Sequence, residues 1–287
     1  MEQTYPRFTP DMKKTHKILI PNMAPVQFRI LAASMENHGY QVELLGNCGE
    51  RVAELGLKYV HNDTCYPALL VIGQFLDALD SGKYDLDHTA LIITQTGGGC
   101  RASNYIFLLR KALEKMDMEY VPVISLSFGG YEHYSGFKIT PGMMATGIRS
   151  LIYGDMLLLL KNQCLPYEQN EGDTRRVVEK WIASLTDQFR RKEGLSAGAM
   201  KKNLAAMAKD FHDIPKVKRD TVKVGIVGEI YVKYSSFGNN GLEKFLRTQD
   251  CEYMLPGIMG FVLFKIDNRI EDHHLYGGSL VKLLFCK

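Results

Sequence analysis

Short apolar runs alternate with helical patterns along the first 130 residues, and this alternation constrains the fold more than any other feature. Residues 17–21 form an apolar run, residues 26–37 follow with helical periodicity, and residues 41–45 form a second run. Strand–helix–strand spacing of this kind is typical of a parallel sheet with helices packed on its faces. The sequence therefore predicts an α/β fold that opens with a doubly wound sheet.

The same alternation continues as far as residue 127. Residues 66–79 and 103–116 carry helical patterns, and residues 89–94 and 121–127 are short apolar runs with many β-branched side chains. The loops that follow parallel strands share the carboxyl edge of the sheet, where ligands bind in open α/β folds. We therefore expect a ligand-binding cleft at that edge.

The middle of the chain is predicted to be helical. Residues 141–160 form a long apolar pattern that Arg149 and Asp155 interrupt, so we interpret it as a buried helix between domains and not as a membrane span. Residues 173–191 and 197–211 are amphipathic and highly charged. They predict a helical hairpin that connects two α/β units.

A second α/β unit is predicted to begin near residue 222. Residues 222–227 and 251–255 have strand patterns, with a helix expected over residues 242–248 between them. Residues 257–287 are too few to complete a domain as large as the first, and we expect no further helix among them. The predicted organisation is a first domain over residues 15–166, a helical connector over residues 167–220, and a partial second domain over residues 221–287.

Two cysteines stand at the end of a loop and directly before a helical pattern. Cys65 precedes a helix whose first turn contains Pro67, and Cys100 follows the three glycines at positions 97–99. The first turn of a helix has unpaired N–H groups and the positive end of the macrodipole, which lowers the pKa of a thiol and stabilises a bound anion. Both positions therefore favour thiolates.

The residues alone leave three interpretations of this cysteine pair. Both thiols could be buried structural groups, since free cysteine behaves as a small apolar residue. The glycines could form a phosphate-binding loop, although the Gly-Lys-Ser/Thr sequence of such loops does not follow them. The thiols could hold a metal or an iron–sulfur cluster, although they are not arranged as Cys-x-x-Cys.

The two cysteine segments resemble the 2-hydroxyacyl-CoA dehydratase superfamily. Residues 62–68 read NDTCYPA and residues 95–105 read QTGGGCRASNY. Within the superfamily they are most similar to the branch of CoA-substrate-specific enzyme activase-like or double-cubane-cluster proteins. The resemblance runs from about residue 17 to residue 264, with further matches in order at residues 21–23, 123–127, 153–155, 228–234 and 239–240.

The resemblance implies a cysteine-ligated iron–sulfur cluster, of the 4Fe-4S or double-cubane type, between Rossmann-like domains. It implies Cys65 and Cys100 as metal ligands, an ATP-hydrolysing activator protein as electron donor, and an acyl-CoA or other small molecule as substrate. Family members continue beyond this chain's end with a segment that supplies another ligating cysteine, and no such segment is matched here. We therefore expect a C-terminally truncated copy, or one that is completed by a sister subunit or by a homodimer partner.

Polar residues beside the cysteines are candidates for contacts with the cofactor. Asn62 and Asn104 could donate hydrogen bonds to cluster sulfurs, or could simply cap helices. Arg101 could face a cluster's negative charge or a substrate phosphate, or could form a surface salt bridge. His61 is a candidate proton donor, and Glu229, after a predicted strand, is either a proton-handling carboxylate or an ordinary acid at a helix start.

Charge and cysteine content exclude several other classes. The net charge of +3 has no basic stripe behind it, so we expect neither nucleic acid nor membrane as a partner. Without an export signal, the six cysteines should be reduced thiols in the cytoplasm. No Gly-x-Ser-x-Gly elbow, His-Glu-x-x-His motif or ATP-binding loop occurs. The four cysteines outside the two segments are expected to be core or surface thiols: Cys48, Cys164, Cys251 and Cys286.

The function expected from the resemblance is that of an iron–sulfur component in an ATP-dependent, low-potential reductase or dehydratase system acting on 2-hydroxyacyl-CoA or a related substrate. The alternative is a non-catalytic subunit, or a fragment that keeps the fold without a complete cluster, because two ligands are fewer than a four-iron cluster needs. A third hypothesis is a nucleotide- or CoA-binding domain without metal.

Overall fold

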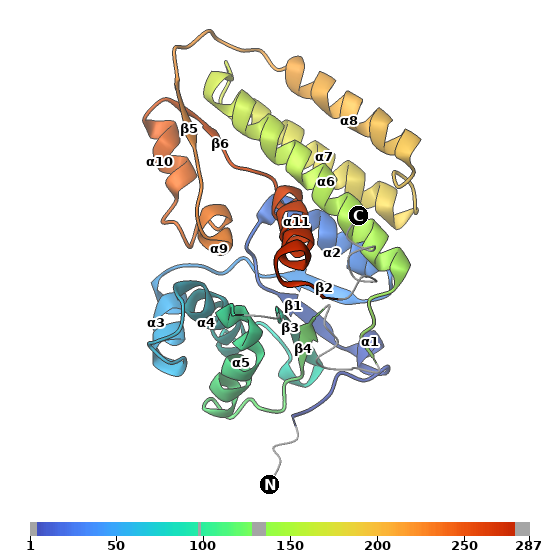
Figure 1. The fold of residues 1–287 in the computed structure, drawn as a ribbon, viewed down its shortest axis with the longest axis vertical. Coiled ribbons are helices and arrows are strands. Elements are labelled where there is room, and N and C mark those ends of the chain that lie inside the picture. Colours follow the sequence, from blue (N-terminus) through green and yellow to red (C-terminus); the bar gives the residue numbers. More distant parts are fainter. Residues whose placement is uncertain (1–4, 97–98, 128–135, 279–287) are drawn as a thin grey trace.

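The computed structural model describes residues 5–96, 99–127 and 136–278, and its centre is a four-stranded parallel sheet. The strands are β1 (Lys17–Ile20), β2 (Gln41–Leu44), β3 (Thr89–Thr94) and β4 (Val123–Leu126), in the spatial order β2-β1-β3-β4. All three strand pairings are parallel. The predicted α/β class and the four predicted strands are confirmed, and the carboxyl ends of all four strands lie on one edge (Figure 1).

Helices cover both faces of this sheet. On one face α4 (Tyr66–Asp80) and α5 (Tyr105–Glu114) pack against Leu19 and other side chains of alternate strand positions. On the other face α2 (Pro25–Asn37) and the beginning of a later helix pack against Ile18 and its neighbours. Successive strand residues point to opposite faces, so one apolar strand supplies two cores.

Helix α3 (Glu50–Tyr59) was not expected from the sequence. It packs on α4 at a close crossing, where Gly56 of α3 and Gly73 of α4 face the partner helix. A Cβ atom on Gly56 would collide with the carbonyl of Leu69, so the two backbones touch without intervening side chains. This pair of helices supports the loop that leads to Cys65.

A second core lies beyond α2 and is formed by α6 (Pro141–Cys164), α7 (Asp173–Arg190) and α8 (Ala197–His212). By length and composition alone residues 141–167 could cross a membrane, a criterion that core helices also meet. Tyr153 of α6 is fully buried and donates a hydrogen bond to the carbonyl of Gly194 at 2.7 Å. Nine residues of α6, Tyr153 among them, are buried.

A two-stranded parallel sheet follows, formed by β5 (Val222–Gly225) and β6 (Cys251–Met254). It packs with α9 (Ile230–Tyr234) and α10 (Leu242–Thr248) around a core that also includes Leu158 of α6. The strands and α10 agree with the sequence prediction. Shorter described elements are α1 (Met12–Thr15) and the 3₁₀ turns Leu86–His88, Arg101–Ser103 and Leu165–Tyr167.

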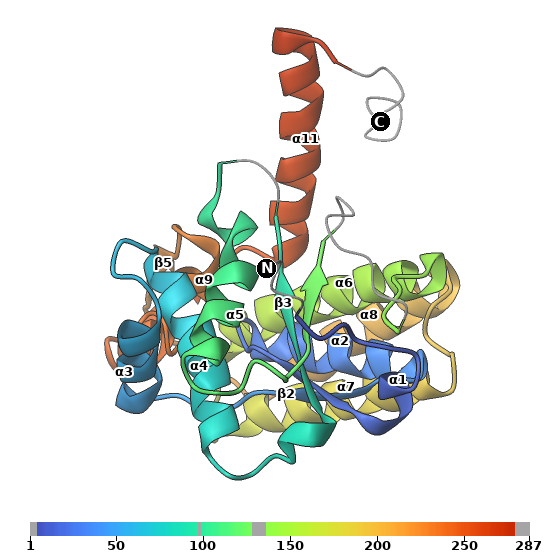
Figure 2. The ribbon, with the colours of Figure 1, turned by 90° about the horizontal axis from the view of Figure 1, so that it is seen from below.

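The expectation that no helix follows residue 257 was wrong. Helix α11 spans Ile258–Tyr276, and Figure 2 shows it projecting from the body of the molecule. Its apolar residues occur around the whole circumference, and only Ile258 is buried. The one-sided apolar stripe that identifies a helix in a sequence is therefore weak here.

Candidate functional site

Cys65 is placed at the start of α4 by a short turn. The backbone N–H of Thr64 donates to the carbonyl of His61 at 3.0 Å, and the carbonyl of Cys65 accepts the first helical N–H bond, from Ala68, at 3.0 Å. Cys65 is the N-cap residue of α4, with extended φ and ψ, and its side chain makes no capping bond. The half-buried thiol points instead towards α5, where its Sγ lies 2.9 Å from the Oη of Tyr105.

Cys100 precedes a single 3₁₀ turn, Arg101–Ser103, and not α5 itself, which begins at Tyr105. Its thiol is exposed, and its carbonyl accepts a hydrogen bond from the Ser103 hydroxyl at 2.7 Å. The expectation that both thiols lie at helix N-termini is therefore confirmed for Cys65, whereas Cys100 precedes only a 3₁₀ turn and the α-helix expected from residue 103 begins at Tyr105. Two of the preceding glycines, Gly97 and Gly98, lie outside the described residues.

Two buried polar residues that the sequence did not single out hold the Cys100 loop against the sheet. The Gln95 side chain follows β3, and its Nε2 donates to the carbonyl of Ser103 at 3.2 Å. Its Oε1 accepts a hydrogen bond from the hydroxyl of Ser125, on β4, at 2.6 Å. The loop is thus fixed to two neighbouring strands. Gln95 and Ser125 both lie within segments that carry the family resemblance, but their spacing in the sequence does not show that the two side chains pair.

Tyr105 is the residue at which the two cysteine loops meet. It is the first residue of α5 and is 8% exposed. Burial is the largest cause that raises the pKa of its hydroxyl, followed by the hydrogen bond to Cys65 and by the negative charges that Cys65, Cys100 and Glu229 can carry. The contact that the structure shows at this hydroxyl is the one to the Cys65 sulfur.

Glu229 lies at the start of α9, and its charge is among the causes that raise the pKa of Tyr105. It follows β5 as the N-cap of α9, and its Oε2 accepts a hydrogen bond from the backbone N–H of Val232 at 2.9 Å. Tyr231 of α9 is 5% exposed and packs into the apolar core beneath α4 and α5. Burial raises the pKa of Tyr231, and charges on Tyr66 and Glu229 raise it further. The second sheet therefore closes one side of the cysteine site.

The polar neighbours of the cysteines lie on the exposed rim. Asn62, Arg101 and Asn104 are all exposed. Asn104 is the residue before α5, but its side chain makes no capping hydrogen bond. His61 is also exposed, and its Nδ1 accepts a hydrogen bond from the backbone N–H of Asp63 at 3.2 Å. These side chains border the thiols without being locked by the protein.

The remaining cysteines lie elsewhere. Cys48 is exposed on the loop after β2, whereas Cys164 and Cys251 are buried and donate weak hydrogen bonds to backbone carbonyls. Burial raises the pKa of the Cys164 thiol. Cys286 falls outside the described residues. The expectation of core or surface thiols agrees with the first three.

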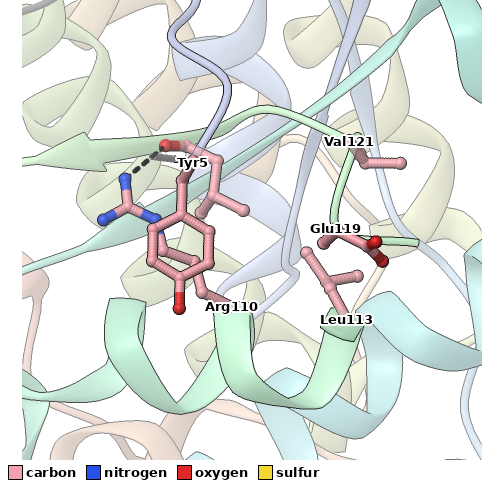
Figure 3. A pocket seen from close by; sticks show the side chains of 6 residues that line it. Tyr5, Arg110, Leu113, Glu119 and Val121 are labelled. Carbon is pink, nitrogen blue, oxygen red and sulfur yellow. Dashed lines mark hydrogen bonds between the residues drawn. The ribbon is translucent and has the colours of Figure 1, made fainter. Parts of the chain in front are cut away.

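Within the described part of the chain, no three His, Cys, Asp or Glu side chains converge closely enough to hold a metal ion. Two hollows lie away from the cysteines. One of about 330 Å³ is bordered by Arg51 and Asp80. The other, between Tyr5 and Arg110, has no room for a water molecule, and the guanidinium stacks 4.9 Å from the tyrosine ring centroid (Figure 3).

Taken together, these observations describe a half-buried thiol in contact with a buried phenol, beside a loop that carries an exposed thiol. Thiolates are soft ligands that suit zinc, copper(I) and iron–sulfur clusters. Comparison with protein-family models, with curated proteins and with solved structures finds no match for this chain.

Proposed function

We propose that this protein is an iron–sulfur component of an ATP-dependent, low-potential reductase or dehydratase system, acting on 2-hydroxyacyl-CoA or a related substrate. The single observation that carries the proposal is the contact between the Cys65 sulfur and the hydroxyl of Tyr105, the residue that directly follows the Cys100 loop. This contact brings together two cysteine loops that are 35 positions apart in the sequence, at the carboxyl edge of the sheet. That is the edge at which α/β folds bind their ligands.

The donor set fits part of a cluster site. Cys65 and Cys100 would hold the cluster, and when bound it would supply one-electron transfer at low potential. Because no third ligand joins them in the described residues, the other ligands would come from elsewhere, and a sister subunit or a second copy of this chain is the proposed source. The exposure of Cys100 leaves its sulfur accessible to such a partner.

The rim residues would serve the substrate and the cluster. Arg101 is exposed beside Cys100, where its guanidinium could pair with the phosphates of a CoA thioester. The side chains of Asn62 and Asn104 could donate hydrogen bonds to cluster sulfurs. In this proposal the first sheet is a Rossmann-like, doubly wound domain, and β5 and β6 belong to a second, partial one. The site then lies between the two domains.

Anaerobic reconstitution tests the proposal directly. The purified chain is incubated with iron and sulfide, desalted, and analysed for bound iron and acid-labile sulfide. We expect cluster binding that is lost in Cys65→Ser and in Cys100→Ser and kept in Cys48→Ser, which removes an exposed thiol outside the site. The loaded cluster should also protect Cys65 and Cys100, but not Cys48, from alkylation.

Failure of the wild-type chain to retain iron would contradict the proposal. It would favour the alternative of a non-catalytic subunit or a fragment without a complete cluster, an alternative to which the lack of a third ligand in the described residues also points. Because the sequence contains no ATP-binding loop, ATP hydrolysis is assigned to the activator protein. ATPase activity of the purified chain alone would contradict that assignment.

A further inference from the structure

The Tyr105 hydroxyl makes its hydrogen bond to a sulfur atom. The phenol is 8% exposed at the first position of α5, and its Oη lies 2.9 Å from the Sγ of Cys65. A buried hydroxyl without a partner destabilises the folded state, so this sulfur is what satisfies it. A phenylalanine would fill the same apolar space, and only the oxygen distinguishes the two side chains.

The direction of this hydrogen bond follows from the chemistry of the cysteine. A thiolate has no proton and can only accept, whereas the phenol retains one to donate. Whenever Cys65 is deprotonated, as a metal ligand must be, the bond therefore runs from the Tyr105 O–H to the Cys65 sulfur. Because α4 and α5 are anchored in one apolar core, the donor is fixed in place before any ligand binds.

We propose that Tyr105 is a positioning residue that donates a hydrogen bond to the Cys65 sulfur, fixes the orientation of that side chain and raises the reduction potential of the cluster that Cys65 would help to hold. This inference rests on the proposed function. A donor to a ligating sulfur stabilises the reduced, more negative state of a cluster more than the oxidised state. The same bond restricts the Cys65 side chain to one orientation.

The test compares Tyr105→Phe with Tyr66→Phe. Tyr66 is the residue next to Cys65, but its side chain is 46% exposed, and no hydrogen bond joins it to a sulfur among the described residues. All three proteins are reconstituted anaerobically, and the midpoint potential is measured by a redox titration followed by electron paramagnetic resonance. We expect the midpoint potential to be about 59 mV more negative in Tyr105→Phe, which corresponds to a tenfold change in the one-electron reduction equilibrium. In Tyr66→Phe the potential should stay at the wild-type value.

A second measurement uses the cluster-free, reduced chain. The S–H stretching band of Cys65 in the Raman spectrum, assigned by its loss in Cys65→Ser, should shift in Tyr105→Phe and stay in place in Tyr66→Phe. This measurement needs no metal. It reports the hydrogen bond at the Cys65 sulfur, which a change in packing alone would leave in place.

The outcomes separate this inference from the proposed function. If the wild-type chain retains no iron, the proposed function fails, and the tuning role of Tyr105 fails with it. If wild type and Tyr105→Phe both load a cluster at the same potential, only the inference about Tyr105 is overturned. An S–H band that is unchanged in Tyr105→Phe overturns it as well.

Discussion

Asp155, in the middle of α6, caps the first turn of α11, where its Oδ1 accepts the backbone N–H of Ile258 at 2.9 Å. Its Oδ2 accepts the N–H of Met259 at 2.8 Å, and the Gln27 side chain of α2 donates to Oδ1 at 3.0 Å. One carboxylate thus joins three helices from distant parts of the sequence. Gly257, at the N-cap, leaves room for it, because a Cβ there would collide with the carboxylate.

Replacing Asp155 with Asn should destabilise the protein by about 1–2 kcal/mol, because one hydrogen bond and the charge at the N-terminus of α11 are lost. Urea unfolding measures the change, and hydrogen exchange should show faster exchange at Ile258 and Met259. Asp187→Asn is the control, since Asp187 pairs with Arg191 at an exposed position of α7. Its effect should stay below about 0.5 kcal/mol, and equal effects of the two variants would contradict the capping role.

Replacing Gly73 with Ala should destabilise the protein by about 1–3 kcal/mol, because the added methyl group would collide with the carbonyl of Val52 and force α3 away from α4. Gly198→Ala is the matched control: it lies in α8, and its Cβ would meet no atom within 4 Å. There the change should be neutral or should stabilise by up to about 1 kcal/mol. Urea midpoints that fall equally in both variants would rule out the close crossing.

The contribution of Glu43 to stability should depend on pH. Partial burial of this carboxyl would raise its pKa, but hydrogen bonds from Lys83, Lys17 and Tyr84 outweigh burial and lower the pKa to about 2. A carboxyl with a lowered pKa stabilises the folded state above its unfolded pKa of about 4.5, and that stabilisation is lost as the pH falls towards 2.

Glu43→Gln should therefore be less stable than wild type near pH 6, and the difference should shrink steadily between about pH 4.5 and pH 2. Chemical unfolding at a series of pH values measures the difference. Glu54→Gln, which changes an exposed carboxylate on α3, serves as the matched substitution. A stability difference for Glu43→Gln that is constant over this range would show that the three donors do not act on the carboxylate.

Backbone amides in α11 beyond its first turn should exchange with solvent at least on the order of a hundredfold faster than those of α4. Twelve residues of α4 are buried, whereas Ile258 is the one buried residue of α11. Helix α11 can therefore open locally without disturbing a core. Hydrogen exchange followed by mass spectrometry compares the two helices in one sample. Equal protection would mean that a further contact covers α11 in solution.

The sequence predicted the first sheet well, because its strands are short runs of apolar, β-branched residues whose preference is local. Residues 89–94 illustrate this, since the predicted strand and β3 coincide. Cys65 at the start of α4 was also predictable, because Pro67 favours the first helical turn. Helix α11 was not predictable from the sequence, because its apolar side chains lie around the whole circumference and are mostly exposed.

Local preference by itself determined the α/β class, the parallel strands and the positions of the two cysteines at the ends of their loops. Only the tertiary structure decided that Tyr105 contacts Cys65, that Tyr231 of α9 packs into the core beside them, and that Gln95 ties the Cys100 loop to Ser125. Cys65 and Tyr231, which belong to one core, are 166 positions apart in the sequence. Such meetings depend on strand order and on the packing of whole helices, which the periodicity of a single segment does not encode.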